Sequence, residues 1–85
     1  MPNKNYLKGR KKEYKVLKEC RAKGHIALRS AGSHSPIDIV DINLVERIIR
    51  FVQCKPDSMS ENAKNKILEE NSLLKGPFYV FFEVV

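Results

Sequence analysis

The order of helix-forming and strand-forming segments is the feature that most constrains this fold. Residues 5–23 are good helix formers without proline, and Gly24 follows them as a C-terminal stop. Three short runs rich in β-branched residues come next, at positions 25–30, 37–42 and 47–55. Short connections between such runs favour an antiparallel meander.

The last third of the chain adds a second helix and a fourth strand to this prediction. Ser58 and Glu61 have the S-x-x-E spacing of a capping box, which predicts a helix from Ser58 to about residue 75. Its core-facing side chains are expected to be Ala63, Ile67 and Leu74. The pair 76–77, Gly-Pro, breaks the helix, and the aromatic and β-branched residues 78–85 predict a strand. A strand, a helix and a further strand imply a right-handed crossover with parallel pairing of the last strand.

Length and composition fit a small folded domain. With 85 residues there is room for one core, so we expect a single domain over 1–85 of the α/β class, a mixed central sheet of about four strands flanked by two helices. So short a chain buries a modest share of its surface, which makes a partner subunit plausible. Because there is neither an apolar run of about twenty residues nor a signal peptide, we expect a cytoplasmic protein with no membrane partner.

Positive charge is concentrated at the start of the chain. The net charge is +6, which attracts polyanions. Nine of the sixteen basic residues lie before residue 24, against two acids, Glu13 and Glu19. The charge count alone leaves two interpretations equally open, a solvated helix face and a surface that contacts phosphates.

The first helix carries a short stripe of core positions. Tyr14, Leu17 and Cys20 fall at i, i+3 and i+6 and are expected to be buried, with Glu13 on the edge of the same face. Neither Cys20 nor Cys54 has a CxxC or Cys/His ligand spacing. The sequence therefore indicates neither a zinc site nor a disulfide, and both cysteines are expected to be small core residues.

Four polar residues lie where this layout makes polarity costly. Glu13 is on the inner edge of the first helix, and Asp38 lies within an Ile/Val strand. Gln53 and Lys55 are two apart on the next strand, so their side chains share one face, while Cys54 points to the other. If the two strands pair, a carboxylate, an amide and an ammonium group can converge at one sheet edge.

That set of groups suits hydrolysis assisted by a metal ion. Mg²⁺ prefers oxygen ligands and keeps several waters, so one or two carboxylates with neutral oxygens can hold it against a phosphodiester. The ion polarises the phosphoryl oxygen and lowers the pKa of a bound water, and a nearby lysine stabilises the developing charge or orients the nucleophile.

Four short segments make the pattern more specific. In order and spacing they resemble the archaeal Holliday junction resolvases of the PD-(D/E)XK nuclease superfamily, and the resemblance covers about residues 5–56. The segments are 8–13 (KGRKKE), 29–33 (RSAGS), 36–40 (PIDIV) and 53–55 (QCK). The resemblance implies a restriction-endonuclease-like core and a Mg²⁺- or Mn²⁺-dependent endonuclease. It also implies a homodimer that cuts two opposing strands of branched DNA.

The resemblance also implies a role for individual residues. The metal ligands would be Glu13, Asp38, Gln53 and the backbone carbonyl of Cys54, with Lys55 as the catalytic lysine and Ser30 as a loop serine that contributes to cleavage. Substrate would be bound by Lys8, Arg10, Lys11, Arg29 and Ser33. The chain departs from the family at Gln53, where glutamate is usual, so one negative charge is missing and metal affinity should fall. The resolvases also generally continue past the last strand predicted here.

Structural roles compete with each of these assignments. Asp38 could bond backbone amides at a strand end, Glu13 could pair with Arg10 or Lys12 on the helix surface, and His25 is expected to be structural. At the level of the whole protein, two functions compete with a junction resolvase. One is a nicking or general nuclease of a virus or plasmid replication or repair system, and the other is a catalytically inactive DNA-binding module.

Overall fold

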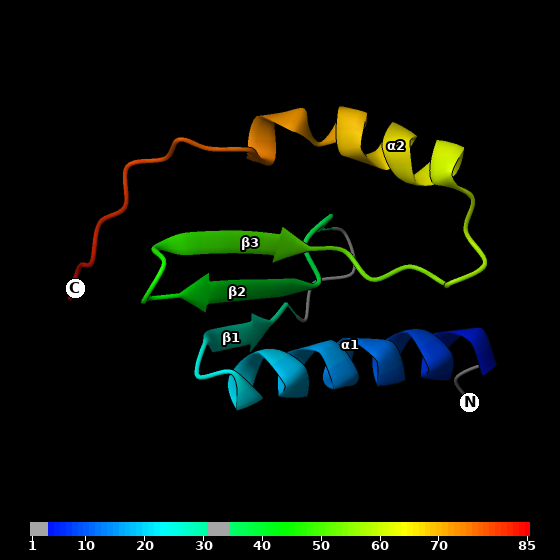
Figure 1. Cartoon of the computed structure of the whole chain (residues 1–85), viewed down its shortest axis with the longest axis horizontal. Helices are drawn as coiled ribbons and strands as arrows, with labels where there is room; N and C mark the ends of the chain where they lie inside the picture. Colours follow the sequence, from blue (N-terminus) through cyan, green and yellow to red (C-terminus); the bar gives the residue numbers. More distant parts are fainter. Residues whose placement is uncertain (1–3, 31–34) are drawn as a thin grey trace.

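The structure is a computed structural model that describes residues 4–30 and 35–85, and in this part of the chain it confirms a small α/β fold. An open three-stranded antiparallel sheet lies between two helices (Figure 1). The elements, in chain order, are α1 (Lys4–Ala22), β1 (Ile26–Arg29), β2 (Ile39–Asn43), β3 (Ile48–Val52), α2 (Glu61–Glu70) and the 3₁₀ turn η1 (Ser72–Leu74). Within the described ranges, neither α-helix is long and apolar enough to cross a membrane.

The end of α1 follows the predicted glycine stop. Gly24 has φ of 86°, a conformation that side chains with a Cβ rarely adopt. The amide of Gly24 donates to the carbonyl of Arg21 at 3.0 Å, and the amide of His25 donates to that of Cys20 at 3.2 Å. These two bonds form a Schellman motif, which turns the chain so that β1 packs back against the helix.

The three strands form the predicted meander. Their order is β1-β2-β3, and both pairs are antiparallel. The turn between β2 and β3 is held by Asn43, whose Oδ1 accepts hydrogen bonds from the backbone amides of Val45 at 3.1 Å and Glu46 at 3.2 Å. Such an Asx turn is a common reason for asparagine after a strand.

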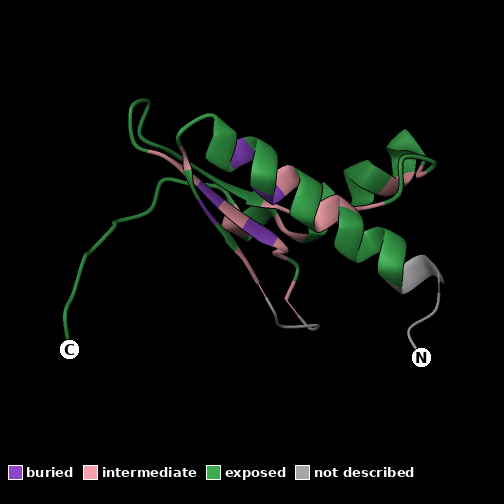
Figure 2. Cartoon of the chain, turned by 90° about the horizontal axis from the view of Figure 1, so that it is seen from below, coloured by how far each residue is buried: buried purple, intermediate pink, exposed green. Residues whose placement is uncertain are grey.

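The core lies between α1 and the sheet, where Figure 2 shows the buried residues. It consists of four buried apolar residues, Leu17, Cys20, Ala27 and Ile39, and the half-buried Val16, Val52 and Cys54 pack against them. The predicted stripe is therefore right at Leu17 and Cys20. It is wrong at Tyr14, which is 47% exposed. The ring of Tyr14 instead lies 5.0 Å from the guanidinium carbon of Arg29 and 5.7 Å from that of Arg10, so cation–π contacts hold it at the surface.

Helix α2 begins two residues later and ends earlier than the sequence predicts. Its N-cap is Ser60, not Ser58, and the Ser60 hydroxyl accepts a hydrogen bond from the amide of Ala63 at 3.2 Å. After Glu70 the chain tightens into η1, which reaches Leu74. The three side chains predicted to face the core, Ala63, Ile67 and Leu74, are all half-buried.

The predicted fourth strand does not form in this structure. Residues 78–85 form no strand, and most of their side chains are exposed, Tyr79 by 95% and Phe82 by 94%. Phe78 makes an edge-to-face contact with Phe51 of β3, with 6.2 Å between ring centroids. Aromatic and β-branched residues favour a strand only where backbone groups of an adjacent strand are available to pair. Because this segment pairs with no strand, neither the parallel pairing nor the crossover forms.

Candidate functional site

Asp38 is held at the point where all three strands come together. Its amide donates to the carbonyl of Val52 and its carbonyl accepts from the amide of Ser30, both at 2.8 Å. Its carboxylate Oδ2 accepts a hydrogen bond from the amide of Cys54, also at 2.8 Å. The aspartate of the PIDIV segment and the QCK segment are therefore direct neighbours at one end of the sheet.

Glu13 projects from α1 toward the end of β1. Its Oε2 accepts a hydrogen bond from Nε of Arg29 at 2.9 Å, and both side chains are less than a quarter exposed, at 19% and 23%. Glu13 thus pairs with Arg29 of the sheet. An ion pair of this kind fixes a carboxylate at the helix–sheet junction.

Cys54 connects the two acidic residues electrostatically. The pKa of its thiol is raised, first by burial and then by the negative charges of Asp38 and Glu13, while the charge of Lys12 lowers it. Both predicted acidic ligands thus lie near enough to act on one residue at the end of β3. Lys12 also reaches this point, since its Nζ donates to the backbone carbonyl of Lys55 and, at 2.8 Å, to Oδ1 of Asp57.

Gln53 and Lys55 face a cavity on the far side of β3. The cavity has a volume of about 490 Å³, and its lining includes Ser35 and Pro36 from the segment that leads to Asp38. The amide oxygen of Gln53 is buried and has no hydrogen-bond partner among the described residues. Buried polar atoms are rarely left unpaired, so this oxygen is an exception that calls for a partner such as a water molecule or a ligand.

The predicted site residues thus form two groups and not one. Asp38 lies beside Cys54, with Glu13 close by and bound to Arg29, whereas Gln53 and Lys55 face the cavity.

Comparisons with protein-family models, curated proteins and solved structures find no match for this chain. The donor set still fits Mg²⁺ or Mn²⁺, because two carboxylates, a backbone carbonyl and an unpaired amide oxygen are hard oxygen ligands.

The predicted substrate-binding residues differ in exposure. Lys8, Arg10 and Lys11 are exposed on the first half of α1. Arg29 is half-buried in its ion pair, and Ser33 lies outside the described residues, in the segment 31–34. Ser30, predicted to contribute to cleavage, is half-buried beside Asp38.

Sequence reasoning missed a second polar cluster, centred on Asp41. This carboxylate is 1% exposed, on the face of β2 that α1 covers. It accepts hydrogen bonds from Nε of Arg50 and shares one with Nδ1 of His25, each at 2.9 Å. Burial would raise the pKa of Asp41, but the hydrogen bonds from Arg50 and His25 hold it below its ordinary value of 3.8.

One sequence signal could have revealed this cluster. In a strand with period two, Asp41 shares a face with Ile39, the most deeply buried residue of the core. A carboxylate in that position needs cationic or hydrogen-bonding partners, and these come from two other elements.

Proposed function

We propose that this chain is a metal-dependent endonuclease that hydrolyses DNA phosphodiester bonds, with branched DNA such as four-way junctions as its substrate. The observation that carries the proposal is the 2.8 Å hydrogen bond from the Cys54 amide to the Asp38 carboxylate. It joins the aspartate to the strand end that bears Gln53 and Lys55, which is the pairing that the resemblance to the resolvases requires. The unpaired amide oxygen of Gln53 adds support.

In this proposal, some of the residues bind the metal ion and Lys55 stabilises the charge on the phosphate. A bound Mg²⁺ or Mn²⁺ would act as a Lewis acid toward the phosphate and lower the pKa of a coordinated water. The two groups of residues would come together around the ion: Asp38, Glu13 and the carbonyl of Cys54 would hold it from the side of α1, and Gln53 from the side of the cavity. The ammonium group of Lys55 would stabilise charge that develops on the phosphate.

The exposed cations of α1 give this proposal its DNA-binding surface. Lys8, Arg10 and Lys11 lie on the same helix as Glu13, so a strand bound along them would approach the helix–sheet junction. Contacts of this kind bind the phosphate backbone without reading sequence, which suits a protein that recognises DNA by shape.

Exposed apolar side chains on the sheet support the proposed homodimer and a fourth strand in its sheet. On the face of the sheet away from α1, Leu28 is 55% exposed, Ile49 42% and Phe51 38%. We include in the proposal that a second copy fills the open cavity of about 1030 Å³ between this face and α2, which Ile49 and Phe51 line, and that residues 78–85 become the fourth strand of a restriction-endonuclease-like core in the dimer. Covering these side chains would supply burial that four core residues do not.

The dimer is tested by Phe51→Asp. We expect sedimentation equilibrium to give a dimer for the wild-type chain and a monomer for this variant, because a charge would be buried at the interface. Val45→Asp is the matched control, since Val45 is 94% exposed in the β2–β3 turn and its variant should remain dimeric. A monomeric wild-type chain, or equal effects of both substitutions, would contradict the dimer.

The nuclease itself is tested with labelled four-way junction, nicked duplex and single-stranded DNA. Each is incubated with Mg²⁺ or Mn²⁺ and again with EDTA. Symmetric cutting of the junction that EDTA stops supports the proposal, while equal cutting of all substrates indicates the general nuclease. Binding without cutting would identify the inactive DNA-binding module and overturn the proposal.

Gln53→Glu tests the departure from the family. It replaces the unpaired amide oxygen with a charged one, and a full charge a few ångströms from an ion is worth about 1 kcal/mol or more. We therefore expect the Mg²⁺ concentration for half-maximal cleavage to fall about fivefold, with Gln53→Ala raising it. A loss of cleavage in Gln53→Glu would mean that the amide N–H groups, and not the oxygen, are what the site needs.

A further inference from the structure

We propose that Cys20, His25 and Asp41 form a binding site for Zn²⁺, separate from the proposed nuclease site. Each residue offers one ligand atom, and the three atoms lie within 4.8 Å of one another. Among the described residues, these three side chains form the one group of cysteine, histidine and carboxylate ligands that lie close enough together to hold a single ion. Its members come from the end of α1, the turn after it and β2.

The backbone fixes the relative positions of the three ligands. The Schellman motif ties the amide of His25 to the carbonyl of Cys20 at 3.2 Å, so the thiol and the imidazole leave the same turn. Asp41 is paired in register with Ala27 of β1, directly after that turn. Nδ1 of His25 already lies 2.9 Å from Oδ1 of Asp41, so these two ligands need only small movements to hold one ion.

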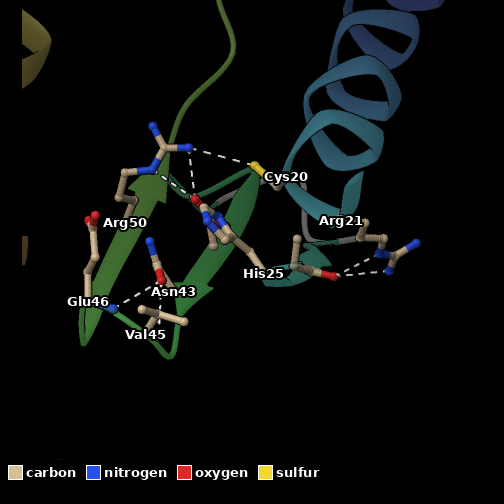
Figure 3. A network of polar contacts seen from close by, with 9 residues as sticks. Cys20, Arg21, His25, Asn43, Val45, Glu46 and Arg50 are labelled. Atoms are coloured by element: carbon tan, nitrogen blue, oxygen red, sulfur yellow. Dashed lines mark hydrogen bonds and ion pairs between the residues drawn. The ribbon is translucent and has the colours of Figure 1, made fainter. Parts of the chain in front are cut away.

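A cation already occupies the point where these groups converge. Nη2 of Arg50 lies 2.8 Å from Oδ2 of Asp41 and 3.7 Å from the sulfur of Cys20. Figure 3 shows Cys20, His25 and Arg50 turned toward one another. The Arg50 side chain is 54% exposed, on the edge strand β3, whereas Asp41 is 1% and Cys20 4% exposed. Arg50 can therefore move into solvent and leave the buried ligands in place for a metal ion.

The ligand chemistry selects Zn²⁺ among common divalent ions. A thiolate, an imidazole and a carboxylate are the three ligand types that Zn²⁺ binds in four-coordinate sites, with water free to take the fourth position. Mg²⁺ prefers six oxygen ligands and would be a poor fit to sulfur and nitrogen. On binding, the thiol of Cys20 loses its proton to solvent, and the thiolate with the Asp41 carboxylate balances the two charges of the ion.

A metal here would compensate for a small core. Four buried apolar residues hold α1 against the sheet, and one of them is Cys20 itself. A structural metal adds stability to a small domain, whose hydrophobic core supplies little net stability by itself. A bound ion would join α1, the turn and β2 at the end of the sheet opposite Asp38.

Cobalt titration of the full chain tests the site. Co²⁺ substitutes for Zn²⁺, and a thiolate ligand gives a near-ultraviolet charge-transfer band together with the visible bands of tetrahedral Co²⁺. We expect both, with Zn²⁺ abolishing them in competition and Mg²⁺ leaving them unchanged. Cys20→Ser should remove the charge-transfer band. Cys54→Ser is the matched control, because it removes the other cysteine and should retain the full spectrum.

Arg50→Met provides a test in the opposite direction. Removing the competing guanidinium should tighten Co²⁺ binding by about tenfold or more, because the ion no longer has to displace a positive charge. A gain of affinity that keeps the visible bands of tetrahedral Co²⁺ requires the three ligands to be assembled, so this test remains informative even if Cys20→Ser is unstable.

Several outcomes would overturn the zinc site. They are a cobalt spectrum without a thiolate band, loss of the band in Cys54→Ser with retention in Cys20→Ser, and unchanged or weaker binding in Arg50→Met. Asp38→Asn should bind Co²⁺ with the same charge-transfer band as the wild type. The zinc site and the nuclease can thus fail independently of each other.

Discussion

Asp38→Asn is expected to reduce junction cleavage by about a thousandfold, an effect of the size seen when one group that stabilises a transition state is removed. Asparagine has the same shape, and its Oδ1 can still accept the hydrogen bond from the Cys54 amide. The substitution therefore removes the negative charge that would hold the metal and leaves the local structure intact. Single-turnover rates at saturating Mg²⁺ measure the effect.

The Asp38 variant should still bind DNA. Gel-shift affinity for the four-way junction, measured in EDTA, should change by less than about twofold, because the phosphate contacts proposed for α1 do not involve Asp38. Asp57→Asn is the matched control, since Asp57 is a fully exposed carboxylate bound to Lys12 near the same strand end. If Asp38→Asn cuts as fast as Asp57→Asn, the assignment of Asp38 as metal ligand is wrong.

The sequence predicted correctly those parts of the fold that depend on a few neighbouring residues, namely the end of the first helix and the three-stranded meander. The stop at Gly24 depends on one residue's tolerance of positive φ, and the meander depends on short turns between β-branched runs. The segment 78–85 has the same strand-like composition, yet it forms no strand. These residues form no strand because a strand must hydrogen-bond to the backbone of a neighbouring strand, and composition alone does not supply that neighbour.

The candidate site was predictable to the same limited extent. The sequence placed Asp38 near the QCK segment because adjacent strands of a meander must pair, and the hydrogen bond to Cys54 agrees with this. It did not predict that Glu13 binds Arg29, since that contact depends on how α1 crosses the sheet. Asp41 was missed for a similar reason, because its partners His25 and Arg50 come from other parts of the chain.

The ion pair of Asp41 and Arg50 should make a measurable contribution to the stability of the metal-free protein. Asp41 is 1% exposed, and without Arg50 its charge would be left in the core with His25 as its remaining partner. We expect Arg50→Met to lower the free energy of unfolding by about 2 kcal/mol at neutral pH, less than for a fully buried pair because Arg50 is half-exposed. Urea unfolding in EDTA measures the change.

A double-mutant cycle separates this charge effect from lost packing. Asp41→Asn combined with Arg50→Met removes both charges, so no buried carboxylate is left without its partner. The double variant should therefore be more stable than Arg50→Met alone. If the two substitutions were simply additive, the ion pair would contribute nothing of its own, and the core would have to be explained by apolar packing.

The same pair predicts how stability changes in acid. Hydrogen bonds from Arg50 and His25 hold the pKa of Asp41 below 3.8 in the folded state, despite burial. Its contribution is therefore complete above the unfolded-state pKa and is lost as the pH falls below 3.8 toward the lower folded value. Asp41→Asn lacks this titration, so its unfolding free energy in EDTA should decline less steeply with falling pH over this range. Parallel curves for the two proteins would show that the pKa of Asp41 is not depressed in the folded state, because only a depressed folded-state pKa makes the wild-type curve the steeper one.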